Sequence, residues 1–131
     1  MFEKFEFSKK QINKYYHSAL EDLKIASDST TPEVVFRFCY DVLLKLAIAV
    51  CAENGLRVKA RQGHHIELIK KLSYYLKDSE IELLANEMRT KRNWNLYGGG
   101  ILISAKEAKD YLKWTRAIFQ KVENYFQNLA E

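Results

Sequence analysis

The chain contains few of the residues that interrupt regular structure. Its 131 residues include one proline and five glycines. Because these two residue types break helices and mark turns, their scarcity favours long regular elements joined by few turns. The apolar and charged fractions are ordinary for a globular chain that is large enough to bury its own core. We therefore expect residues 1–131 to form a single, mainly helical domain.

Cysteine is also scarce, and the two present are Cys39 and Cys51. Both fall in one apolar run that is predicted as a single helix, which would place them roughly 18 Å apart at about 1.5 Å per residue. A disulfide requires Cα atoms about 4.4 to 6.8 Å apart, so these thiols cannot join within the chain. The sequence predicts buried, reduced cysteines in a cytoplasmic protein, with no metal site and no cofactor.

Signals for export or membrane insertion are missing as well. The first residues, Met-Phe-Glu-Lys-Phe-Glu-Phe, have neither the basic start nor the apolar stretch of a signal peptide. The apolar run 34–52 is interrupted by Arg37, Asp41 and Lys45 on one helical stripe, where Asp41 can pair with either neighbour. A lipid-embedded helix would not carry such a stripe. We expect a central helix buried on nearly all sides, a kind of helix that often needs a second subunit to cover part of it.

Neither sign of charge dominates the chain. There are 21 Lys and Arg residues against 17 Asp and Glu residues, which gives a formal net charge of +4. This mild excess permits contact with an anionic partner without requiring one. A predicted loop carries Arg57, Lys59 and Arg61, for which phosphate contact and plain solvation are equally good interpretations.

Helix start signals recur along the chain. Ser8 with Gln11, and Ser104 with Glu107, have the spacing of a capping box. Pro32 suits a first helical position, since its fixed backbone angle matches the helix. Either Asp78 or Ser79 is expected to cap the fourth helix, and Gly55 is expected to end the second.

Apolar spacing extends each of these signals into a helix. The predicted helices cover about residues 9–27, 32–54, 64–76, 79–97 and 105–129. Because the connections are short, sequential helices should pack antiparallel. The sequence therefore predicts an all-α fold, a single five-helix bundle with up-down, largely antiparallel packing.

The fourth predicted helix carries the most informative residue, Arg92. It falls on the apolar stripe traced by Ile81, Leu84, Ala85 and Met88. Because an unpaired buried charge is costly, Arg92 needs a partner. The candidates are Asp41 or Glu53, a phosphate, or a neighbouring subunit. By helical phase alone, Arg89 and Lys91 point elsewhere and are ordinary solvated residues.

The glycine run 98–100 follows this helix directly. Phosphate loops and dinucleotide-binding glycines follow a strand instead, so the run predicts a helix end and a sharp reversal. His64 and His65 begin the third helix, where capping or packing is expected ahead of catalysis. With no second ligand motif, the pair does not predict a metal site.

The order of motifs resembles a HEPN domain over nearly the whole chain. The resemblance is carried by an amphipathic first helix, Val35-Phe-Arg-Phe-Cys-Tyr-Asp-Val-Leu-Leu44, Asn54-Gly55, Gly63-His64, Arg92-Asn93 and a long final helix. It implies a small helical bundle that is commonly dimeric. It also implies a minimal nucleotidyltransferase as partner, often within a toxin–antitoxin pair.

Active HEPN proteins resemble metal-independent ribonucleases, whose signature is an arginine followed, after four to six residues, by a histidine. Arg92-Asn93 matches the first half, but Tyr97 stands at the first permitted histidine position and Gly98 and Gly99 fill the others. The histidine is expected to assist attack of the ribose hydroxyl while the arginine steadies the developing charge. A tyrosine with a pKa near 10 is a poor base at neutral pH.

These observations predict a non-catalytic HEPN-like binding module. Its nucleotide- or RNA-binding residues are expected to be Arg89, Lys91, Arg92, Asn93 and Tyr97. The expected partners are a second copy of the chain, a nucleotidyltransferase, and RNA or a nucleotide. The alternative is a metal-independent endoribonuclease toxin in which Arg92 is catalytic; a purely structural interaction domain is the third possibility.

Overall fold

The computed structural model describes the backbone of residues 1–60, 63–97 and 103–130, and the side chains of these except 94–97 and 130. Within this part of the chain the predicted all-α character is confirmed, with α1 (Lys9–Asp28), α2 (Pro32–Glu53), α3 (His64–Leu76), α4 (Ser79–Tyr97) and α5 (Ala105–Ala130). The predicted boundaries differ from these by two residues or fewer.

Local capping explains why the boundaries were predictable. Both capping boxes form: Ser8 Oγ accepts from the Gln11 amide at 3.2 Å, and Ser104 Oγ accepts from the Glu107 amide at 3.0 Å. At α4 the cap is Asp78, whose Oδ1 accepts from the Glu80 amide at 3.1 Å. These bonds satisfy backbone donors that the first helical turn leaves without partners.

The short two-stranded sheet was not predicted. Strand β1 (Phe2–Lys4) pairs antiparallel with β2 (Leu56–Val58), inside the segment predicted as a basic loop. Gly55 makes the turn from α2 into β2 with φ of 71°, a region that favours glycine. Arg57 pairs with Glu3 across the two strands at 2.5 Å, so its charge is engaged within the protein. Arg61 lies outside the described residues.

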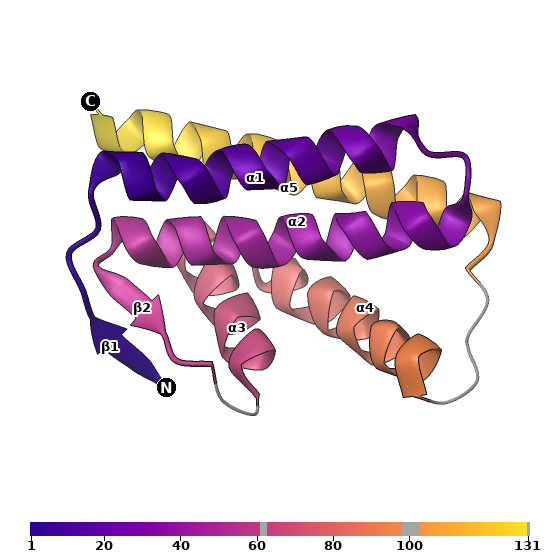
Figure 1. The fold of residues 1–131 in the computed structure, drawn as a ribbon, viewed down its shortest axis with the longest axis horizontal. Helices are drawn as coiled ribbons and strands as arrows, with labels where there is room; N and C mark the ends of the chain where they lie inside the picture. The colour runs from indigo at the N-terminus through magenta and orange to yellow at the C-terminus, as the bar shows by residue number, and fades with distance from the viewer. Residues whose placement is uncertain (61–62, 98–102, 131) are drawn as a thin grey trace.

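Helix α2 occupies the centre of the molecule (Figure 1). Helices α1 and α5 lie along one side of it, and the shorter α3 and α4 approach its other side at an angle. Helices α1 and α2 run antiparallel, whereas α5 runs in the same direction as α2. The two-stranded sheet of β1 and β2 lies near the end of α2.

The core is built around α2, as its apolar run predicts. Tyr40, Val42, Leu46 and Val50 are fully buried. Neighbouring helices of the same chain supply this burial, while Phe38, Leu44 and Ile48 of α2 stay partly buried. No helix in the described ranges is both long and apolar enough to cross a membrane.

Both cysteines are buried and free, which confirms the prediction that they form no disulfide. Burial raises the pKa of Cys39 to about 11 and that of Cys51 to about 12. Both therefore remain protonated thiols near neutral pH and behave as small apolar side chains.

Candidate anion-binding site

A cavity of about 250 Å³ lies where the start of α2 meets α4. Its lining residues come mainly from α2 and its cap: Thr31, Glu33, Val34, Phe36, Arg37 and Tyr40, together with Arg92 from α4. Arg37 and Arg92 bring two positive charges to this cavity. Among the described residues that line it, Glu33 is the one carboxylate.

Arg92 is half-buried and lies against an aromatic ring. Its guanidinium carbon is 5.6 Å from the centre of the Tyr40 ring, which is within the range of a cation–π interaction. No ion pair links Arg92 to a carboxylate within the part of the chain that the structure describes. Among the described residues, no ion pair therefore competes with an anion that enters the cavity for the Arg92 guanidinium.

The two structural partners predicted for Arg92 do not form ion pairs with it. Burial, together with the charge of Asp22, raises the pKa of Asp41, and the nearby Arg92 opposes this. Lys45, one of the two neighbours with which Asp41 could pair, instead forms an ion pair with Asp22 of α1 at 2.6 Å. Arg92 is therefore close enough to lower the pKa of Asp41 but forms no ion pair with it.

The N-terminus of α2 adds a second feature that favours anions. The side chain of its N-cap residue, Thr31, makes no capping hydrogen bond within the described residues. Pro32 has no amide hydrogen, but the backbone amides of Glu33 and Val34 keep their partial positive charge, and both residues line the cavity beside Arg37. Helix N-termini of this kind commonly bind phosphate or carboxylate groups.

Beneath Arg92, Tyr40 is hydrogen-bonded to a histidine from α3. The Tyr40 hydroxyl lies 3.1 Å from His65 Nδ1. Burial, assisted by His64 and the charges of Arg92 and Arg89, lowers the pKa of His65 to about 4. Burial also raises the pKa of Tyr40 to about 12. At neutral pH, Tyr40 and His65 are therefore both uncharged, and they share one hydrogen bond.

This Tyr40–His65 pair is the part of the site that sequence reasoning missed. His65 was expected to cap or pack, and it does pack against Tyr40, with ring centres 5.9 Å apart. Nothing in the spacing of the two residues connects them. Tyr40 lies three residues beyond Arg37 on the same helix, which is the one sequence signal that could have placed it beside a basic side chain.

Lys91 is directed away from the cavity toward α5. Its Nζ lies 2.7 Å from the Tyr111 hydroxyl and 2.9 Å from Glu107 Oε2, with Glu87 Oε1 at 3.4 Å. Burial alone would lower the pKa of Lys91, but the bonds to Tyr111 and Glu107 raise it above its usual range. With a side chain 19% exposed, Lys91 is not the solvated residue that helical phase predicted.

The remaining predicted site residues are Arg89, Asn93 and Tyr97, and the structure describes the side chains of the first two. Arg89 is half-buried, donates to Asn86 Oδ1 at 3.4 Å, and lies close enough to lower the pKa of His65. Asn93 is half-buried beside Arg92. Tyr97 is the last residue of α4, but its side chain lies outside the described residues, as does the glycine run 98–100.

Comparison with known proteins adds no relative. The chain matches no family model, no curated protein and no solved structure. Within the described residues, no group of three or more His, Cys, Asp or Glu side chains is arranged to hold a metal ion. Inferences about function therefore depend on the geometry of the site and on the sequence motifs.

Proposed function

We propose that the protein is a non-catalytic HEPN-like binding module that holds a phosphate of a nucleotide or RNA at the Arg92 cavity. The observation that carries the proposal is the meeting of Arg37, Arg92 and the start of α2 around one cavity, with Arg92 in no ion pair among the described residues. A guanidinium can make paired hydrogen bonds to phosphate oxygens, and amides at a helix start add donors.

The environment of the cavity suits an anion with an aromatic part. Phe36 and Tyr40 lie buried behind the two arginines, and the half-buried Val34 in the same lining leaves apolar surface for a base or ribose while a phosphate meets the guanidinium groups. The negative charge of Glu33 repels an anion that comes close to it in this cavity. A ligand whose phosphate lies at Arg92 is therefore favoured.

The wider setting follows from the HEPN resemblance alone. In this proposal the protein acts in the cytoplasm as a homodimer, beside a nucleotidyltransferase in a toxin–antitoxin or defence-type system. Arg89 and Asn93 lie next to Arg92 on α4 and extend its surface toward RNA, and Tyr97 completes the set at the helix end.

Calorimetry with nucleotides and with short RNA tests the phosphate site. Arg92→Ala should weaken binding about 10- to 100-fold, because a charge-assisted hydrogen bond is lost. Added salt should weaken binding of RNA to the wild-type protein, and the salt dependence should be smaller in the variant. Arg116→Ala is the matched control, since Arg116 lies on α5 and bonds Ser27. Equal affinities for Arg92→Ala and wild type would refute the proposal.

One observation favours a second candidate, a metal-independent endoribonuclease. The neutral imidazole of His65 is held beside Arg92 through Tyr40, in a chain that lacks a histidine at position 97. Incubation with RNA in chelator, followed by analysis for 2′,3′-cyclic phosphate ends, tests this candidate. Cleavage that disappears in both His65→Gln and Arg92→Ala would replace the binding module by an enzyme, and intact RNA would leave binding as the function.

A further inference from the structure

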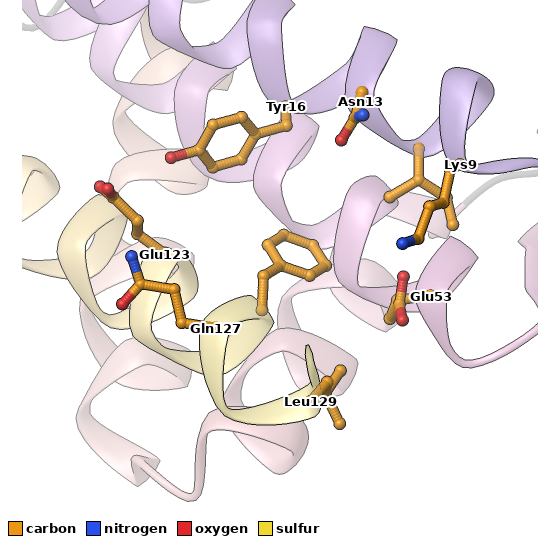
Figure 2. Close-up of a pocket in the computed structure, with 9 residues that line it drawn as sticks. Lys9, Asn13, Tyr16, Glu53, Glu123, Gln127 and Leu129 are labelled. Atoms are coloured by element: carbon orange, nitrogen blue, oxygen red, sulfur yellow. The ribbon is translucent and has the colours of Figure 1, made fainter. Parts of the chain in front are cut away.

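A second cavity, of about 370 Å³, lies at the other end of α2 (Figure 1). It is formed by the start of α1 and the ends of α2 and α5, and it is lined by Lys9, Ile12, Asn13, Tyr16, Glu53, Glu123, Phe126, Gln127 and Leu129 (Figure 2). Its volume falls in the range typical of small-molecule sites. The proposed phosphate site uses none of these residues.

The middle of this cavity is apolar. Tyr16 and Phe126 line it with their rings edge to face at 6.0 Å, and Ile12 is nearly buried beside them. Leu129, also in the lining, is 53% exposed, which leaves apolar surface that a ligand can cover. Aromatic faces of this kind attract cations as well as hydrocarbon.

Two carboxylates lie on opposite sides of this apolar surface. Figure 2 shows Glu123 on the side of Tyr16, and Glu53 on the other side near Lys9. Neither glutamate forms an ion pair within the described part of the chain. Burial raises the pKa of Tyr16, which lines the cavity, and Glu123 raises it further through its charge and through a hydrogen bond. This concentration of negative charge contrasts with the net charge of +4 of the whole chain.

The ends of α2 and α5 add partial negative charge at the cavity, and the start of α1, with Lys9, adds positive charge. Glu53 is the last residue of α2, and α5 ends at Ala130, just beyond Leu129. Neither helix carries a basic residue in its last turn. The free carbonyl groups of a helix end carry partial negative charge, which a nearby cation stabilises. Among the described residues that line the cavity, Lys9 of α1 is the one cation.

We propose that this cavity binds an aliphatic α,ω-diamine, with one ammonium group at Glu53 and the other at Glu123. The methylene chain between them then lies on Ile12, Phe126 and Leu129, which buries hydrocarbon on both surfaces. A monoamine can form an ion pair with only one of the two carboxylates, and an uncharged diol can form an ion pair with neither. The two separated charges and the apolar surface between them therefore select for a diamine.

Calorimetry of the full chain with diamines of three to six carbons tests the proposal. Each diamine is compared with the monoamine and the diol of the same length. The matching diamine should bind several-fold more tightly than the monoamine. Glu53→Gln and Glu123→Gln should each weaken its binding about two- to fivefold, the effect expected of a partly exposed ion pair. Glu21→Gln, a change of an exposed glutamate on α1, is the matched control.

Lys9 provides a test of opposite sign. Because its ammonium competes for Glu53, Lys9→Gln should strengthen diamine binding by a similar factor. Circular dichroism of each variant confirms that the fold is retained. Equal binding of diamine and monoamine, no binding at millimolar concentrations, or affinities that do not change in the glutamate variants would overturn the proposal. Arg92→Ala should keep diamine binding, so failure at one cavity is distinguishable from failure at the other.

Discussion

The stability of the protein should fall as the pH is lowered, because the folded protein holds the half-buried His65 as a neutral imidazole. The folded protein holds the pKa of His65 at about 4, against its ordinary value of 6.5. Between these values the unfolded chain binds a proton that the folded chain does not. The contribution of His65 is therefore complete above about pH 6.5 and is lost progressively as the pH falls toward 4.

The magnitude follows from this difference. At about 1.4 kcal/mol per pKa unit, the full shift corresponds to about 3 kcal/mol of unfolding free energy. His65 is half-buried rather than buried, so solvent screening reduces the expected loss to about 1–2 kcal/mol. That loss is a sizeable fraction of the stability of an ordinary domain.

Urea unfolding at a series of pH values between 7.5 and 4.5 measures this loss directly. His65→Gln should be less stable than wild type at pH 7.5 because the Tyr40 hydroxyl loses its imidazole partner, yet its stability should depend less steeply on pH. His17→Gln, on an exposed part of α1, is the control and should follow wild type. Parallel pH profiles for His65→Gln and wild type would refute the reasoning, as would an NMR titration of His65 with a midpoint near 6.5.

Two further substitutions examine contacts around the candidate site. Lys91→Met removes the ammonium that joins Glu107 and Tyr111, so the free energy of unfolding should fall by about 1–3 kcal/mol, and nucleotide affinity should fall because α4 is less firmly held beside α5. Unchanged stability in urea would contradict this role. Ser104→Ala removes the cap of α5 and should lower the free energy of unfolding by about 1 kcal/mol. Nucleotide affinity should not change. A loss of affinity in this variant would show that the two regions are coupled.

Much of the secondary structure could be predicted because its causes are local. Ser8 and Ser104 bond groups three residues away, and Pro32 begins α2 as its fixed backbone angle favours. The two-stranded sheet of β1 and β2 was missed for two reasons. Each strand has three residues, too few to show an alternating pattern, and two helices separate the strands in the sequence.

The candidate site could be predicted only in part. Arg92 was correctly placed at least partly inside the fold, since helical phase determines which face of α4 it occupies. The direction of Lys91 could not be predicted, because its partners Glu107 and Tyr111 lie 16 and 20 residues away on another helix. Tyr40 and His65, 25 residues apart, meet only because α3 packs against α2.

The sequence by itself determined the elements of this protein: helices with their caps, a central apolar α2, and an arginine on the inner face of α4. These depend on interactions within one or two helical turns, which the order of residues specifies directly. The tertiary structure decided which charges share a space. It brought Arg37 to Arg92, and Glu53 to the cavity that Glu123 lines, because helix packing alone joins residues from distant parts of the chain.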